Sequence, residues 1–203
     1  MLPTFRNLLF GAAMMVVSLA ANAASVTLVD VANSQDRNGF YAGFYTLNID
    51  GQDVPALCDD FTTTSTVGEN WTANVYTYAD VNSGSGKFGP NPAIYSQAGY
   101  LFSLALSADY TNQADIDNAI WKIMDPGVTL ANANATAYFN TATSGAYDMF
   151  DWSAYMQVLT PEPSSASQEF LIPVAPVPLP AAAWLFGSGL FGLGALARRR
   201  RPI

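Results

Sequence analysis

The 203-residue sequence contains no histidine. Histidine is the usual general base at neutral pH and the commonest metal ligand, so a Ser-His-Asp triad, a Cys-His dyad and a histidine-zinc site are excluded within this chain. Cys58 is the only cysteine, which excludes an intramolecular disulfide and leaves a thiol that is buried, reactive or joined to another molecule. We therefore expect no cofactor, no metal ion and no catalytic residue, and we predict that the protein is not an enzyme.

Positive charge is also scarce, with eight Lys and Arg against sixteen Asp and Glu. All of the acidic residues lie between Asp30 and Glu169. The basic residues within that stretch are Arg37, Lys87 and Lys122. Such an acidic region repels nucleic acid, so we expect no nucleic-acid partner.

The first 23 residues have the pattern of a secretory signal peptide. Arg6 supplies a positive start, residues 8–19 are apolar, and the small residues Ala21 and Ala23 form an A-x-A cleavage site. Cleavage there makes Ala24 the first mature residue. The apolar stretch is short for a membrane span, which favours cleavage over an uncleaved membrane helix. We therefore expect export by the secretion machinery and processing by signal peptidase.

A second apolar segment covers residues 181–197, which contain no charge and only one polar side chain, Ser188. As a helix this segment would be about 25 Å long, the short limit for crossing a bilayer. Pro180 suits the first turn of such a helix. The helix is followed by a basic cluster that predicts a cytoplasmic end, made of Arg198, Arg199, Arg200 and Arg201. We expect a transmembrane helix at 181–197 and a basic cytoplasmic tail at 198–203.

The order of a proline motif, an apolar helix and terminal arginines in "VPLPAAAWLFGSGLFGLGALARRRR" resembles the VPLPA variant of the PEP-CTERM sorting signals. The motif consists of Val177, Pro178, Leu179, Pro180 and Ala181. The resemblance implies that exosortase, a membrane-embedded cysteine protease-like enzyme, recognises this tail and cleaves near the prolines. It also implies a transient stay in the inner membrane, then the cell surface or the extracellular matrix, with exopolysaccharide and biofilm as the setting. The upstream Pro161-Glu162-Pro163 lies too far from the helix for this role, so we expect an ordinary turn there.

Residues 24–173 predict one acidic, extracytoplasmic α+β domain, mainly an antiparallel β-sheet or barrel with inserted helices. Alternating or aromatic-rich segments predict strands at 26–31, 39–49, 52–61, 71–81, 147–161 and 167–174. Asp50-Gly51 predicts a hairpin turn. Helical spacing of apolar residues predicts helices at 92–106 and 111–125, and more weakly at 130–142. Residues 174–180 form a Pro-rich linker that carries the sorting motif.

Within the predicted second helix, Ile116, Ala119, Ile120 and Ile123 form one apolar face. We expect Asp115 and Asp117 to lie near its N-terminus, where carboxylates complement the helix dipole. The helix should stop at Pro126-Gly127.

The middle of the chain is also similar to the thioester domains of bacterial surface adhesins, through "ALCDDF", "NAIWKI" and "SQEFL". In those domains a cysteine and a glutamine form a reactive thioester. Cys58 stands at the cysteine position, but Asp117 occupies the glutamine position, and Gln113 lies one helical turn earlier. An aspartate offers no amide for the ammonia-releasing condensation. The alternative interpretation is a buried, inert Cys58.

Asp59-Asp60 raises the possibility of a carboxylate-dependent glycoside hydrolase or a calcium site. Neighbouring residues of a strand point to opposite faces, so we expect a solvated acidic surface instead. A group of tyrosines is compatible with a carbohydrate-stacking face or with ordinary sheet packing: Tyr41, Tyr45, Tyr76 and Tyr78. Three functional hypotheses remain: an exported matrix protein, a thioester-type adhesin and a secreted hydrolase.

Overall fold

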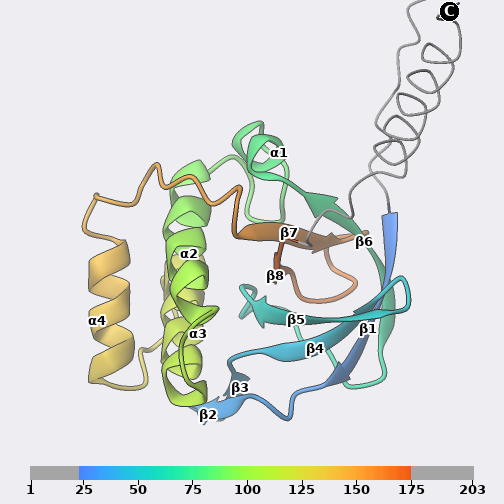
Figure 1. The fold of residues 1–203 in the computed structure, drawn as a ribbon, viewed down its shortest axis with the longest axis horizontal. Helices are drawn as coiled ribbons and strands as arrows, with labels where there is room; N and C mark the ends of the chain where they lie inside the picture. Colours follow the sequence, from blue (N-terminus) through green and yellow to red (C-terminus); the bar gives the residue numbers. More distant parts are fainter. Residues whose placement is uncertain (1–22, 175–203) are drawn as a thin grey trace, which may run out of the picture.

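The structure is a computed structural model that describes residues 23–174. In this part of the chain, six antiparallel strands close into a barrel in the order β1-β4-β5-β8-β7-β6 (Figure 1). The strands of the barrel are β1 (Ala23–Asp30), β4 (Tyr45–Ile49), β5 (Gln52–Cys58), β6 (Asn70–Tyr76), β7 (Met156–Pro161) and β8 (Phe170–Pro173). The predicted α+β class with a mainly antiparallel, barrel-like sheet and inserted helices is confirmed.

Two hairpins are closed by two-residue turns in which both residues have positive φ. Asp50 (φ 50°) and Gly51 (φ 89°) join β4 to β5, as the sequence predicts. Asn38 (φ 59°) and Gly39 (φ 86°) join a second, separate pair of strands. These are β2 (Gln35–Arg37) and β3 (Phe40–Ala42). The second hairpin packs beside helix α3 (Tyr110–Met124), outside the barrel.

The barrel interior is filled by the inward-facing residues of its strands. Alternation along β1 buries Val26 and Leu28, which meet Leu47 of β4 and Leu159 of β7 in one apolar cluster. Aromatic rings add to it, because Trp71 of β6 stacks on a phenylalanine of β8 with 6.0 Å between ring centroids. The barrel therefore has a packed core of its own.

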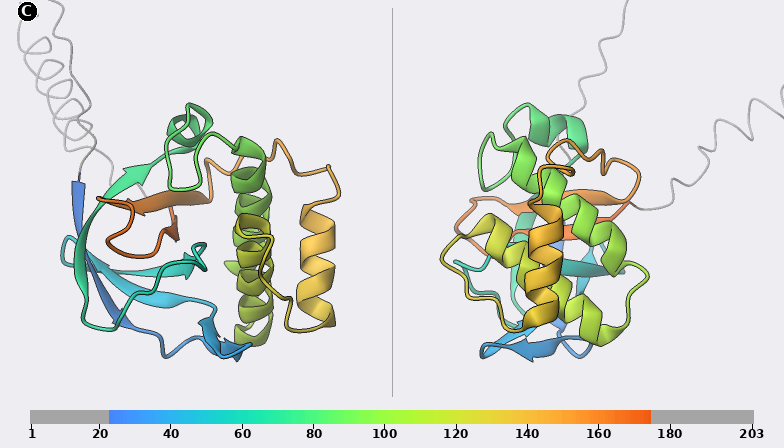
Figure 2. Two further views of the ribbon diagram at one scale, coloured as in Figure 1. Left: turned by 180° about the vertical axis from the view of Figure 1, so that it is seen from behind. Right: turned by 90° about the vertical axis from the view of Figure 1, so that its left-hand side faces the viewer.

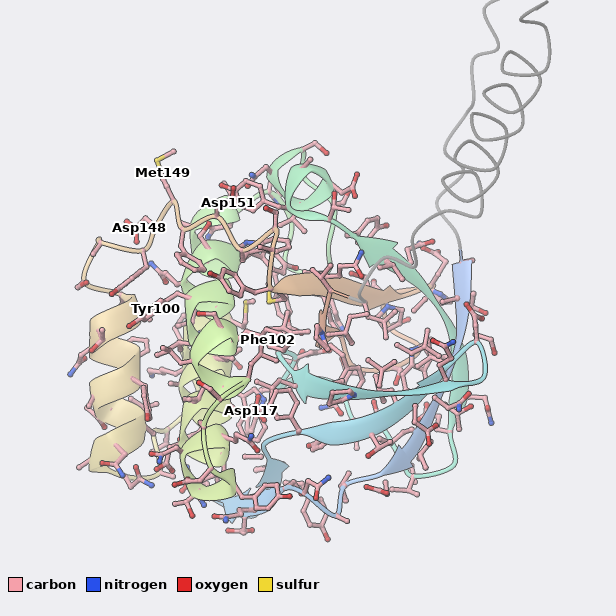
Figure 3. All side chains as sticks on the ribbon, in the orientation of Figure 1. Tyr100, Phe102, Asp117, Asp148, Met149 and Asp151 are labelled. Carbon is pink, nitrogen blue, oxygen red and sulfur yellow. The ribbon has the colours of Figure 1, made fainter. Side chains whose placement is uncertain are left out.

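A layer of helices covers one end of the barrel (Figures 1 and 2). The helices are α1 (Tyr78–Asn82), α2 (Pro92–Ala105), α3 and α4 (Ala133–Ala142), with α4 on the far side of α2 and α3. A second apolar cluster joins the layers, in which Phe102 and Ile120 of the helices contact strand residues such as Leu57. The predicted apolar faces of α2 and α3 are thus confirmed. Figure 3 shows Phe102 on the barrel side of the helices and Tyr100 on the side of α4.

Several details differ from the sequence-based expectations. Helix α3 begins at Tyr110 because the side chain of Asp109 caps it, accepting a hydrogen bond from Asn112 N at 2.9 Å. Asp115 and Asp117 are therefore buried in the middle of the helix, and the prediction that they complement the helix dipole is wrong. The predicted strand at 71–81 ends at Tyr76, since a capping box at Thr77 starts α1.

The segment before β7 is also less regular than expected. Only Met156–Pro161 of the predicted strand at 147–161 is extended, and its earlier residues form turns. Their aromatic side chains pack on α2, where Tyr147 stacks on Tyr100 with 3.5 Å between ring centroids. The turn expected at Pro161-Glu162-Pro163 begins one residue later, because Pro161 still belongs to β7 and residues 162–167 are bends and turns.

Several predicted segments lie outside the described residues. They are the signal peptide up to residue 22, including Ala21, and the linker from residue 175, the sorting motif, the helix at 181–197 and the tail at 198–203. Among residues 23–174, the structure contains no helix of the length and apolarity that a bilayer crossing requires.

The close contact between Gly99 of α2 and Trp152 offers a test of how tightly the helical layer is packed. A Cβ atom at Gly99 would lie 2.5 Å from Trp152 Cγ. We predict that Gly99→Ala lowers the free energy of unfolding by about 1–3 kcal/mol through overpacking, although alanine favours a helix by about 0.5–1 kcal/mol. Urea denaturation measures this change.

The matched background is Trp152→Gly, because Trp152 Cβ would lie 2.6 Å from the new methyl group and any other residue would keep that atom. In that background Gly99→Ala should be neutral or stabilising, because only the helix propensity remains. The same loss in both backgrounds would contradict the packing explanation.

Candidate functional site

Glu169, immediately before β8, is a buried carboxylate at the junction of the barrel and the helical layer. Its Oε2 accepts hydrogen bonds from Lys87 N at 2.8 Å and from the Thr160 hydroxyl. Its Oε1 accepts a hydrogen bond from Tyr95 OH at 2.6 Å. Glu169 therefore joins a strand of the barrel, a helix of the layer and the loop before that helix.

Asp59 is a second buried carboxyl group against Glu169. Burial, followed by the charge of Glu169, raises the pKa of Asp59 well above its usual range. The Asp59 oxygens have no hydrogen-bond partner within residues 23–174. An uncharged, protonated Asp59 accounts for both observations. The Glu169 pKa is raised as well, mainly by burial.

Asp60 is ionised, in contrast to its neighbour. Burial opposes the ionisation of Asp60, but hydrogen bonds from Lys87, Thr62 and Thr63 outweigh burial and lower its pKa. Lys87 Nζ also donates to Thr63 Oγ1 at 2.6 Å. Both acidic side chains of the pair are buried, so the expected solvated acidic surface at Asp59-Asp60 is wrong. The reason is that β8 and the loop of Lys87 cover them.

The same contacts fasten the loop of residues 59–69 to residues 167–169. Gln168 Nε2 donates to Asp60 O at 2.9 Å, and Gln168 N donates to Ser65 Oγ at 3.1 Å. The Ser65 and Ser167 hydroxyls are 2.7 Å apart. The loop is thereby held at several points along its length.

The structure brings Cys58 close to Asp117 rather than to Gln113. Burial, followed by the charge of Asp117, raises the pKa of the Cys58 thiol, which donates to Asp60 O at 3.2 Å. Burial also raises the pKa of Asp117, whose Oδ2 accepts from Gly43 N at 2.8 Å. Figure 3 shows Asp117 between its helix and the barrel.

Gln113 has a different environment. Its Nε2 donates to the carbonyl oxygens of Ala105 and Ala108 at the end of α2, at 3.3 and 2.9 Å. The amide that a thioester would consume therefore caps a neighbouring helix. The group near Cys58 is a carboxyl, which has no ammonia to release. Cys58 itself is buried, in agreement with the alternative interpretation of a thiol within the core.

Three hollows lie in series along the β2–β3 hairpin, and we call them the first, second and third hollow. Their volumes are about 360, 160 and 290 Å³. Phe40 and Phe61 border both the first and the second hollow. Tyr41, Tyr45 and Gln168 border both the second and the third. The hollows thus form one continuous surface, which we call the hairpin groove.

Comparison with known proteins finds no relative of this chain. The chain matches no family model, no curated protein and no solved structure at a significant level.

The sequence analysis does not single out Phe40 and Phe61 of the groove. It names Tyr41 and Tyr45, but only as residues of either a carbohydrate-stacking face or ordinary sheet packing. Tyr41 is exposed and Tyr45 lies below it, whereas Tyr76 and Tyr78 pack against the core between the layers. The turn at Asn38-Gly39 is a strong local signal for a hairpin and could have located the exposed strand β3.

Within residues 23–174, no group of three or more Cys, Asp or Glu side chains could hold a metal ion. The charged groups at the junction of the layers are instead paired with each other and with Lys87.

The Asp59–Glu169 pair predicts an unusual pH dependence of stability. Folding raises the pKa values of both carboxyl groups, so protonation of these groups stabilises the folded state. This stabilisation is complete below about pH 4 and is lost as the pH rises toward the raised pKa values. The free energy of unfolding should fall as the pH rises above about 5, by at most about 1.4 kcal/mol per pH unit for each group. Asp59→Asn keeps the size of the side chain but cannot ionise. In urea denaturation, the free energy of unfolding of this variant should therefore fall less steeply with pH.

Asp53→Asn on the exposed part of β5 is the matched control, and it should keep the wild-type pH dependence. An equally steep fall in Asp59→Asn and the wild type would show that the ionisation of Asp59 does not contribute to it.

Proposed function

We propose that the chain is an exported protein of the cell surface or extracellular matrix. Its signal peptide is removed after Ala23, and the helix at 181–197 with the arginines at 198–201 holds it briefly in the inner membrane. Exosortase then cleaves near the motif at 177–181. The domain of residues 24–173 is the part that remains outside, and it acts by binding rather than by catalysis.

The position of the last strand is the observation that carries this proposal. β8 ends at Pro173, and the motif begins at Val177. Both partners of β8 in the barrel, β5 and β7, lie before it in the chain. Cleavage at the motif would therefore remove the tail without taking any residue from the barrel.

The first strand adds a constraint on the order of events. Ala23 and Ala24 belong to β1 and pair with Asn74 and Ala73 of β6. A protease needs an extended, accessible bond, so signal peptidase has to cleave before β1 and β6 pair. Export of an unfolded chain, followed by folding outside, meets this requirement.

The burial of the carboxyl groups favours a binding role over the hydrolase hypothesis. A glycoside hydrolase needs two carboxyl groups that reach the same sugar. Asp59, Glu169 and Asp117 are all fully buried, and none of them borders the three hollows. The thioester hypothesis is weakened in turn, because the amide of Gln113 is bound to α2.

Mass spectrometry of the mature protein tests the proposal. In cells with exosortase, the mature chain should begin at Ala24 and end near residues 177–181, without Arg198–Arg201. Replacement of Val177, Pro178, Leu179 and Pro180 by alanine should leave the tail attached. In cells without exosortase the native chain should also keep its tail.

Glu162→Ala, in the upstream Pro-Glu-Pro turn, is the matched control and should be processed normally. Mature protein that still carries the four arginines in exosortase-containing cells would overturn the proposal. Loss of processing in Glu162→Ala alone, with normal processing of the motif variant, would place the signal at 161–163 instead.

A further inference from the structure

The hairpin groove is built around two neighbouring aromatic side chains that are exposed. Phe40 is 52 % exposed and Tyr41 is 62 % exposed, both on β3. Both rings border the second hollow. Each ring forms a wall between two hollows. Contiguous exposed aromatic surface of this kind marks a candidate binding site.

The walls of the groove are held in place by the structure beneath them. Phe61 meets Phe40 edge to face with 4.7 Å between ring centroids, and its other neighbour is Trp121 at 5.3 Å. Trp121 is fixed by a hydrogen bond from its Nε1 to Cys58 O at 2.7 Å. On the other side, Tyr45 OH donates to Tyr41 O at 2.6 Å. The aromatic surfaces are therefore arranged before any ligand binds.

The first hollow is also lined by polar side chains. Asn38, Asn118 and Thr129 border it, and Asn118 is only 1 % exposed. Asn118 is held in place because its Oδ1 accepts a hydrogen bond from Ala131 N at 2.8 Å. Amides and hydroxyls of this kind suit a ligand that carries oxygen atoms.

The charge of the groove restricts the ligand further. Arg37 is the one charged side chain that lines the three hollows described here. It is already bound to Asp115 Oδ1 at 2.6 Å and to Thr111 O at 3.1 Å. No positive charge is thus left to attract an anion, and the acidic domain repels one. The remaining polar groups are amides and hydroxyls.

We infer that the hairpin groove binds an uncharged polysaccharide chain. The C–H face of a pyranose ring packs on an aromatic ring, while its hydroxyl groups extend sideways to amide and hydroxyl partners. Rings in series along the groove suit successive sugars of one chain, and the amides and hydroxyls of the lining are the partners of the sugar hydroxyls. The inference rests on the proposed function for the source of the glycan, which is the extracellular matrix.

Isothermal titration of the full chain in a mild detergent tests this inference. The probes are uncharged glucose and mannose hexasaccharides, with a hexagalacturonate as the anionic counterpart. We expect at least one uncharged probe to bind with a dissociation constant of about 1 mM or tighter, and the anionic probe to bind more weakly. Tyr41→Ala should weaken binding by about ten-fold or more, and Tyr41→Phe, which keeps the ring, by about two-fold at most.

Tyr155→Ala is the matched control, because Tyr155 is also exposed (43 %) but borders none of the three hollows. It should bind as the native protein does, and thermal unfolding checks that every variant is folded. Absence of binding to all uncharged probes overturns the inference, as does equal loss in Tyr41→Ala and Tyr155→Ala. Stronger binding of a peptide than of any glycan would assign the groove to a protein partner. None of these outcomes changes the mature C-terminus, so the sorting proposal stands or fails separately.

Discussion

The hydrogen bonds to the buried Glu169 carboxylate are the interaction on which the rest of the structure depends. A barrel of six strands needs only apolar residues inside, but this barrel is covered at one end by helices that come from a long insertion between β6 and β7. Glu169 accepts hydrogen bonds from Tyr95 on α2, from Thr160 on β7 and from the backbone of Lys87. Each of these donors would be left buried and unpaired without it, at about 1–3 kcal/mol each.

This junction also connects the core to the surface. Asp59 and Asp60 follow β5 directly, so their burial fixes where the loop of residues 59–69 begins. The ion pair of Asp60 with Lys87 and the contacts of Gln168 then hold this loop, which carries Phe61 into the wall of the hairpin groove. The groove is therefore supported by the buried acids, although none of them lines it.

Local patterns in the sequence predict part of this arrangement. The Asp50-Gly51 turn, the apolar faces of α2 and α3 and the barrel-like α+β class follow from spacing within short segments. The pairing of Asp59 with Glu169 does not, because the two residues are far apart in the chain and meet only when β5 pairs with β8. Asp117 is a similar case. The dipole argument fails for it because Asp109 starts the helix two turns earlier, and the hairpin packed on α3 then supplies Gly43 N as its partner.

We propose the hairpin groove as the binding surface of the domain. Its most direct test is a map of backbone amide chemical shifts in the protein during titration with an uncharged hexasaccharide. We expect shifts at residues 37–41, 61–67, 118–129 and 168, with the far strands of the barrel and α4 unchanged. Shifts centred on α4 or on the turns at 143–155, or no shifts at any concentration, would contradict it.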